Sequence, residues 1–481
     1  DFDPRPALHF RYGTISVQQM RTALVLLAVE VAGALRSIHD PNTAQQTAKS
    51  KRQSMDNYMD VQYFANITVG GQEITGIVDT GSFELVVFES HCTGCGLAGK
   101  YNSTPSGKHS LGPLTRGLFY GSGDVYAAEA FDQVVVGPFS TINQSFWEAY
   151  EANMPVLNQA RFQSIIGVGP PEMPSIEAWK QTLQSVTTVV QGLGKTGKAT
   201  TWQTDRVLAD MNFSVEISRV PVMLNSYSIE MFSLCLLDKP GRPGYFTWND
   251  TSVHEYPTYF TRVPVLGKHT WAVSMKSVQL VTRTPNAMPT ELACAEGCGA
   301  IVDSGTSLLM MPADVVANLQ TMLKEMGAID CRNLQQLPDL VFKLGDQIFS
   351  LPPDSYLTDV EEGSLPENMA SFARIRRLNE DAGNECRISV MESYSRTELG
   401  PLWILGMPFF RTYYTSFKIG QTLEDRSLYI AHADSDCEPE APESSLMRQA
   451  TREVYHRRLD LKGIYHSPTV RKAIQGGDVE L

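Results

Sequence analysis

One short motif occurs twice in this chain and restricts the folds that it can adopt. The segment Ile-Val-Asp-Thr-Gly-Ser at 77–82 returns as Ile-Val-Asp-Ser-Gly-Thr-Ser at 301–307. Each copy is followed along the chain by two apolar residues and a glycine, at 165–167 after the first copy and at 404–406 after the second. Because both elements recur in the same order, the sequence indicates two related halves and predicts two duplicated lobes.

The residues around these motifs predict an all-β fold. Short runs in which apolar and polar residues alternate recur through the chain, and the first two are separated by Gly70-Gly71, a pair typical of hairpin turns. A helical period is confined to short segments such as 312–326. The chain has 481 residues, 36 of them glycine and 27 proline, which is long enough for two lobes and typical of a turn-rich protein. We expect two β-barrel-like lobes with a cleft between them.

The repeated motif also suggests a chemistry. In each copy an apolar strand leads into an aspartate, Asp79 or Asp303, at a turn whose glycine and hydroxyls can shape and hydrogen-bond a carboxylate. One copy alone fits an ordinary β-turn equally well, but two copies favour a site where the lobes meet. Two carboxylates about 3 Å apart cannot both ionise cheaply, so they share one proton. Such a pair can activate water against a peptide carbonyl and protonate the leaving group, without a metal or a covalent nucleophile.

These residues make the chain resemble the pepsin family of aspartic proteases from about residue 57 to residue 433. The resemblance implies the bilobal pepsin-like acid protease fold and an aspartic endopeptidase in which Asp79 and Asp303 are catalytic. It also implies roles for the motif residues that follow each aspartate. The hydroxyl next to it links the lobes, and the hydroxyl three positions on supports a carboxylate oxygen. The implied dyad-supporting residues are Thr80, Gly81, Ser82, Ser304, Gly305 and Thr306.

The segment at 119–124, Phe-Tyr-Gly-Ser-Gly-Asp, resembles the family's flap, a hairpin that closes over bound substrate. The resemblance implies that the flap residues that contact substrate are Tyr120, Gly121, Ser122 and Gly123. The plain alternative is a glycine-turn hairpin without that role.

The sequence departs from the family directly after the first motif. It has Phe-Glu-Leu-Val at 83–86 where the family usually has Ser-Asn-Leu-Trp, so the tryptophan that normally hydrogen-bonds the flap tyrosine is absent. Glu84 also adds a carboxylate that would raise the pKa of the dyad if it lay close to it. This departure leaves the pH optimum open and supports an alternative function, a catalytically inactive pepsin-like protein that binds peptides or partners.

The eight cysteines form an even number, which suits an oxidising compartment. On its own Cys92-x-x-Cys95 fits a redox motif, half of a zinc site or a small disulfide loop; we favour the loop and expect no metal, because no second pair of ligands completes a zinc site. The family resemblance implies the same Cys92–Cys95 disulfide and two more, Cys294–Cys298 and Cys331–Cys386. The sequence leaves open whether Cys235 and Cys437 pair with each other or stay free.

The N-terminal sequence predicts entry into the secretory pathway. Residues 20–34 combine a methionine, an arginine, a short apolar run and small residues at cleavage spacing, a pattern typical of a signal peptide. The alternative is a membrane anchor, but the run is short for a hydrocarbon layer of about 30 Å, and we expect no stable span. We expect a glycoprotein that is secreted or held in an acidic vesicular or vacuolar compartment. Five glycosylation sequons agree with this route: Asn66, Asn102, Asn143, Asn212 and Asn249.

The rest of the sequence divides around the two lobes. A short propeptide-like stretch precedes them, with Lys-Ser-Lys-Arg at 49–52 as a processing site, and zymogen control stays open. The last stretch reads as a solvated extension with one short helix that we do not expect to carry chemistry. The predicted divisions are upstream residues and signal peptide 1–34, propeptide-like segment 35–56, N-terminal lobe 57–237 with a surface insertion at about 177–220, C-terminal lobe 238–437 and C-terminal extension 438–481.

The net charge and the motifs limit the classes of ligand that we expect this chain to bind. The formal net charge of −13 disfavours nucleic acid, because the net field repels phosphate. The segment at 192–199 nearly matches a phosphate-binding loop but ends in alanine, where that loop needs a hydroxyl for Mg²⁺. We expect a monomer without a cofactor, whose partners are protein or peptide substrates bound in extended form.

Overall fold

The computed structural model describes most of the chain from residue 50 onward. The described residues are 50–171, 222–283, 288–327, 329–360, 386–420, 422–442 and 452–481, with short pieces at 209, 212–213, 216–217, 220 and 376–377. The predicted signal peptide, the phosphate-loop-like segment and nearly all of the predicted insertion lie outside these residues. By its contacts the chain forms two units, one of residues 48–173 and 221–481, the other of residues 1–47 and 174–220.

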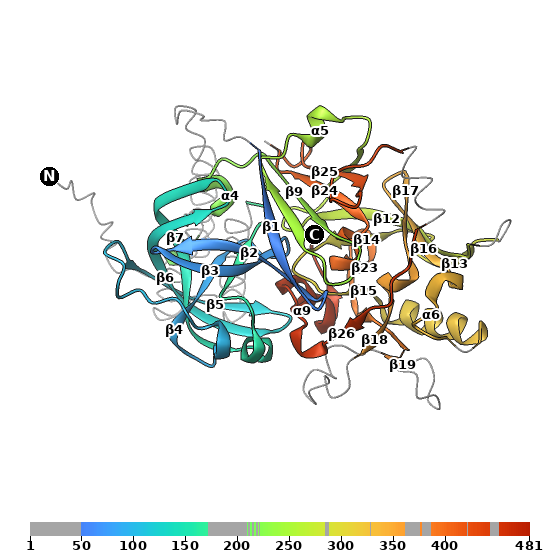
Figure 1. Cartoon of the computed structure of the whole chain (residues 1–481), viewed down its shortest axis with the longest axis horizontal. Coiled ribbons are helices and arrows are strands. Elements are labelled where there is room, and N and C mark those ends of the chain that lie inside the picture. Colours follow the sequence, from blue (N-terminus) through green and yellow to red (C-terminus); the bar gives the residue numbers. More distant parts are fainter. Residues whose placement is uncertain are drawn as a thin grey trace, which may run out of the picture. The chain divides into compact units, whose positions relative to one another are not determined.

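The larger unit is built from strands, as the sequence predicts (Figure 1). Its largest sheet has thirteen strands, and consecutive strands in the following order are hydrogen-bonded. They are β11 (Thr261–Pro264), β25 (Ser427–His432), β24 (Tyr413–Lys418), β9 (Met231–Leu236), β10 (Gly244–Trp248), β1 (Lys51–Tyr58), β2 (Gln62–Val69), β3 (Gln72–Asp79), β8 (Ser164–Gly167), β4 (Leu85–Thr93), β7 (Phe139–Asn153), β6 (Gly123–Val136) and β5 (Ser110–Tyr120).

Two smaller sheets belong to the second half of the sequence. In the ten-stranded sheet the main path is β17 (Gln347–Leu351), β16 (Asp339–Leu344), β12 (Ala272–Val281), β14 (Cys298–Val302), β23 (Gly400–Leu405), β15 (Leu309–Pro312) and β21 (Val390–Ser393), with β13 (Thr290–Ala293) beside β12, β22 (Ser395–Thr397) beside β23 and β27 (Gly477–Asp478) beside β22. The four-stranded sheet is β19 (Arg376–Arg377), β20 (Cys386–Ile388), β18 (Leu357–Val360) and β26 (Arg458–Leu459).

The described α-helices are short. They are α4 (Met223–Ser226), α5 (Ser252–Glu255), α6 (Ala313–Glu325), α7 (Met407–Phe410) and α9 (Pro468–Gln475). The longest is α6, and its bounds agree with the helical period predicted at 312–326. Within the described part of the chain, no helix combines the length and apolar character needed to cross a bilayer.

The sequence repeat is also a repeat of topology. β3 ends at Asp79 and pairs in parallel with β8, and β14 ends just before Asp303 and pairs in parallel with β23. The partner strands β8 and β23 are the two apolar-apolar-glycine elements of the sequence. Each partner also pairs in antiparallel fashion with the strand after its motif, β4 in the first copy and β15 in the second. The duplicated all-β fold predicted from the motifs is therefore confirmed.

The predicted hairpin at the start of the fold is present. β2 and β3 pair in antiparallel register around Gly70 and Gly71, whose φ angles of 57° and 78° favour glycine. The strand before them, β1, begins at Lys51, so the predicted boundary at residue 57 falls inside a strand.

All eight cysteines are described, and they form four disulfides. Two close small loops, Cys92–Cys95 and Cys294–Cys298, and one joins Cys331 to Cys386. The two cysteines whose pairing the sequence left open, Cys235 and Cys437, are bonded to each other across a sequence separation of 202 residues.

The prediction of a solvated C-terminal extension is wrong for residues 452–481, which we call the C-terminal segment. Its apolar residues pack in a buried cluster with residues of β14, β15 and β23, and its strand β26 pairs with β18. Its many charged residues are typical of a solvated segment. The side chain of Arg457, however, is buried and forms ion pairs with Asp60 and Asp354. The predicted short helix is present as α9 (Figure 1).

Candidate active site

Each aspartate of the repeated motif is held by its own turn in the same way. The backbone N–H of Gly81 donates to Asp79 Oδ1 at 2.8 Å, and Ser82 Oγ donates to Asp79 Oδ2 at 2.7 Å. In the second copy Gly305 N–H and Thr306 Oγ1 donate to the two oxygens of Asp303, both at 2.9 Å. Both carboxylates are thus fixed in orientation before any ligand binds.

The two turns are locked together by the hydroxyls next to the aspartates. Thr80 Oγ1 donates to the carbonyl of Val302 at 3.0 Å and accepts from the N–H of Ser304 at 2.9 Å. Reciprocally, Ser304 Oγ donates to the carbonyl of Val78 at 2.7 Å and accepts from the N–H of Thr80 at 3.1 Å. This symmetric exchange joins residues far apart in sequence and holds the aspartates opposite each other.

The glycines of the motifs bring each turn against the opposite carboxylate. A Cβ on Gly305 would lie 2.0 Å from Asp79 Oδ1, and a Cβ on Gly81 would lie 2.7 Å from both carboxylate oxygens of Asp303. These distances are shorter than side chains tolerate, so only glycine fits at either position.

Burial dominates the electrostatics of the pair. Both aspartates are fully buried. Loss of water raises the pKa of Asp79, the charge of Asp303 raises it further, and the hydrogen bonds from Ser82 and Gly81 partly offset this. Burial likewise raises the pKa of Asp303. Two such groups facing each other retain a shared proton at pH values where a free carboxyl is ionised, which suits one of them as acid and the other as base.

The candidate flap is the hairpin of β5 and β6. Tyr120 pairs with Gly123 at its tip, and Gly123 has a φ of 142° and room for no side chain, because a Cβ would lie 2.2 Å from the carbonyl oxygen of Asn153. Tyr120 is buried, and its ring lies 6.1 Å from that of Tyr465. The flap therefore contacts the C-terminal segment.

Three residues of the C-terminal segment reach the dyad, and sequence reasoning missed all of them. Tyr465 Oη donates to Asp79 Oδ2 at 3.0 Å, Thr469 Oγ1 donates to Asp303 Oδ2 at 2.7 Å, and Ser467 Oγ also donates to Asp303 Oδ2. The one signal in the sequence was Ser467-Pro468, a typical helix start, which predicts α9 but not its position.

The residues that depart from the family pattern form a contact of their own. Glu84 pairs with Arg116 of β5 at 2.9 Å, and both side chains are largely buried. The guanidinium of Arg116 also lies 5.5 Å from the ring centroid of Phe83 and 5.9 Å from that of Trp147. Trp147 stands directly across from Val86 in the parallel pair of β4 and β7. Glu84 thus connects the first dyad turn with the strand that leads to the flap.

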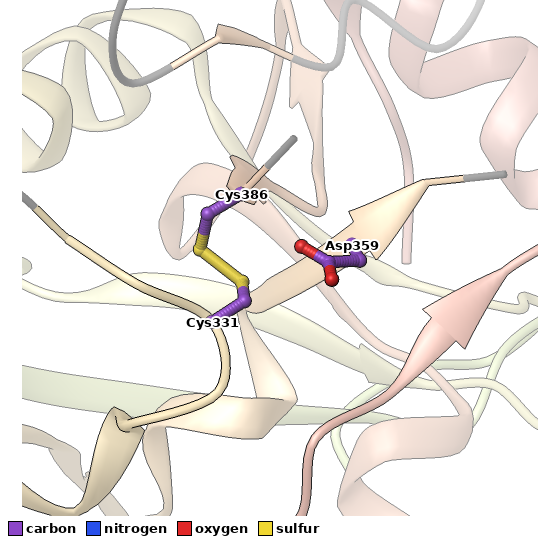
Figure 2. A group of neighbouring side chains, drawn as sticks. All are labelled: Cys331, Asp359 and Cys386. Atoms are coloured by element: carbon purple, nitrogen blue, oxygen red, sulfur yellow. A yellow bond between two sulfur atoms is a disulfide. The ribbon is translucent and has the colours of Figure 1, made fainter. Parts of the chain in front are cut away.

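A second cluster has the composition of a metal site. The ligand-type atoms of Cys331, Asp359 and Cys386 lie within 4.8 Å of one another. Figure 2 shows why these residues do not fit a metal: the two sulfurs are bonded to each other, so neither is a thiolate. Asp359 instead accepts a hydrogen bond from His456 at 2.5 Å.

Comparison with known proteins places this geometry in context. The eukaryotic aspartyl protease family matches residues 62–424. The chain is 28% identical to pepsin II-2/3 of Oryctolagus cuniculus over 396 residues, which cover 79% of this chain and 85% of that protein. It is 29% identical to pepsin A of Canis lupus familiaris and 28% identical to pepsin A of Sus scrofa, each over 76% of this chain and 80% of the relative. The family match includes both aspartate turns and the flap hairpin, and it ends before the C-terminal segment.

Proposed function

The chain belongs to the eukaryotic aspartyl protease family, and on that premise we propose that it is an aspartic endopeptidase whose catalytic residues are Asp79 and Asp303. The observation that carries this proposal is the arrangement of the two carboxylates. Each is buried, each is oriented by its own glycine and hydroxyl, and each faces the opposite turn. A single buried aspartate would need none of this symmetry.

In the proposed reaction the pair works as general base and general acid. The ionised carboxylate takes a proton from a water molecule, and the oxygen of that water attacks the peptide carbonyl carbon. The other carboxyl gives its proton to the carbonyl oxygen. When the tetrahedral intermediate collapses, the first carboxyl passes the proton that it took from water to the leaving amine, and the second regains its proton from a hydroxyl of the intermediate. Ser82, Thr306 and the two glycine N–H groups keep the carboxylates in place throughout.

The substrates that fit this proposal are extended peptides. The flap offers the backbone N–H groups of Gly121 and Ser122, which already donate to main-chain carbonyls of the C-terminal segment at 3.0 and 3.4 Å. A peptide substrate in the same place would pair with the flap as an added strand does. We further propose that the protein works in an acidic part of the secretory pathway or outside the cell. Four disulfides are stable in these oxidising compartments, and an acidic pH keeps the shared proton on the carboxyl pair.

The test is hydrolysis of a quenched fluorescent peptide library between about pH 3 and pH 7 by the wild type, Asp79→Asn and Asp303→Asn. We expect hydrolysis by the wild type and its loss in both variants, because an amide keeps the shape of the carboxyl but cannot relay the proton. Circular dichroism checks that the variants are folded. Binding of a peptide with a non-cleavable hydroxyl isostere, without hydrolysis by any form of the protein, would instead select a peptide-binding protein.

A further inference from the structure

We propose that the C-terminal segment, residues 452–481, is a built-in inhibitor that occupies the substrate's place on the dyad. The inference rests on the proposed function, because it concerns the regulation of the same site. The segment lies outside the residues that match the family, so the family match does not account for it.

The segment blocks the reacting position directly. The hydroxyls of Tyr465, Ser467 and Thr469 all donate to the dyad oxygens Asp79 Oδ2 and Asp303 Oδ2. These are the same oxygens that Ser82 and Thr306 support. A carboxylate pair that is already bonded to hydroxyl groups has no room for an attacking water, and both aspartates are fully buried beneath the segment.

The segment imitates a substrate without presenting a bond to cut. Its backbone pairs with the flap, since Gly121 N–H donates to the carbonyl of Ser467 and Ser122 N–H to that of His466. The carbonyl of Tyr465 accepts from Ser307 Oγ at 3.1 Å. All three carbonyls are therefore engaged away from the carboxylates, and side-chain hydroxyls face the dyad instead. Hydrolysis requires a carbonyl at that position, so the segment is an inhibitor in this arrangement.

Anchors at both ends distinguish the segment from a transient ligand. Arg457, 1% exposed in its side chain, pairs with Asp60 at 2.9 Å, Asp354 at 3.1 Å and Asp238 at 3.2 Å. On the other side of the dyad, Arg471 of α9 pairs with Asp124 of the flap strand β6. Four apolar residues between these anchors are buried in one cluster: Leu459, Leu461, Ile464 and Val470. Charge pairing and apolar burial together hold the hydroxyls on the dyad.

The main experiment removes the segment after folding. A recognition site for an exogenous protease, placed between Pro442 and Arg452 of the full chain, allows the purified protein to be cut and the segment to be washed away in mild denaturant. Two readouts are followed before and after cutting: hydrolysis of the quenched library, and binding of the non-cleavable hydroxyl isostere. We expect both to rise at least about tenfold when the segment leaves, because it competes for the same place.

A synthetic peptide of residues 452–481 then tests the contacts in trans. It should inhibit the separated enzyme competitively, and Tyr465→Phe, Ser467→Ala and Thr469→Val should each weaken its inhibition by about tenfold, the usual effect of losing a hydrogen bond to a charged partner. Tyr455→Phe is the matched control, since its hydroxyl donates to Glu453 of the same segment and not to either aspartate of the dyad.

The outcomes separate this inference from the proposed function. Equal isostere binding and equal hydrolysis before and after separation would overturn the inhibitor role and leave the protease standing. Isostere binding that appears only after separation, without any hydrolysis, would support the blocking segment and overturn the protease. Inhibition in trans that is unchanged by all three hydroxyl substitutions would overturn the assigned contacts.

Discussion

At the scale of single residues, the spacing of the dyad depends on two glycines rather than on the aspartates themselves. The backbones of Gly81 and Gly305 each lie against the carboxylate of the opposite turn, and each also donates its N–H to the aspartate of its own turn. A side chain at either position would separate the pair and break the shared-proton arrangement.

We expect Gly81→Ala to lower kcat/KM about a hundredfold, because displacement of a catalytic group by about 1 Å has an effect of that size. The new Cβ would lie 2.7 Å from both oxygens of Asp303, so the carboxylate must move. The measurement is steady-state hydrolysis by the enzyme freed of its C-terminal segment. Gly107→Ala, at a position with no atom within 4 Å of the added Cβ, is the control and should leave the rate unchanged. Wild-type kinetics in Gly81→Ala would contradict the tight spacing.

At the scale of elements, the contact between the first dyad turn and the flap strand differs from the family pattern. Arg116 of β5 and Glu84 form a largely buried ion pair, and Arg116 also faces two aromatic rings. A buried pair contributes little over apolar replacements, but the loss of one partner leaves a charge inside the protein.

We therefore expect Arg116→Met to lower the free energy of unfolding by about 3 kcal/mol and the double variant Arg116→Met, Glu84→Leu to recover most of that loss. Chemical denaturation of the single and double variants measures both values. The exposed pair of Arg332 and Asp330 is the control, and Arg332→Met should change the free energy by less than about 1 kcal/mol. Additive losses in the double variant would show that the pair is not coupled.

The elements also show which features of the fold the sequence can predict. The aspartate turns were predictable because their chemistry lies within a few consecutive residues, and the repeat then indicated that the two copies belong together. The pairing of Cys235 with Cys437 was left open because it depends on strand β9 meeting the turn after β25, which comes from a distant part of the chain. Glu84 was noticed, but its partner Arg116 was not, because the register between β4, β7 and the flap hairpin is a tertiary property.

At the scale of the whole molecule, the C-terminal segment was the main feature that the sequence did not predict. The many charged residues of the segment obscure its apolar pattern. The carboxylates that pair with Arg457 lie elsewhere in the sequence, at Asp60, Asp354 and Asp238. From the local sequence such a stretch is predicted to be solvated, because it does not contain the residues that form ion pairs with its charged side chains.

We expect His466 to make the docking of the C-terminal segment dependent on pH. It is fully buried, neither ring nitrogen has a hydrogen-bond partner among the described residues, and burial lowers its pKa from 6.5 to about 3. Titratable groups lie on each element around it. Tyr120 and Asp124 belong to the flap hairpin, and Tyr465 and Arg471 belong to the segment. Asp303 lies in the turn whose Thr306 forms a β-bridge with His466. A docked His466 stays neutral where a free one binds a proton, so docking weakens as the pH falls from about 6.5 towards about 3.

The dyad has the opposite effect on docking. Burial raises the pKa of both aspartates, so the docked state binds a proton more readily than the undocked state and is favoured as the pH falls. Comparison of variants isolates the histidine. We expect the full chain to begin hydrolysing the library below about pH 6, and His466→Leu and His466→Gln, which do not titrate, to move that onset at least about one pH unit lower. His91→Leu, at an exposed histidine, should keep the wild-type onset. An unchanged onset in both His466 variants would show that acid does not release the segment through this histidine.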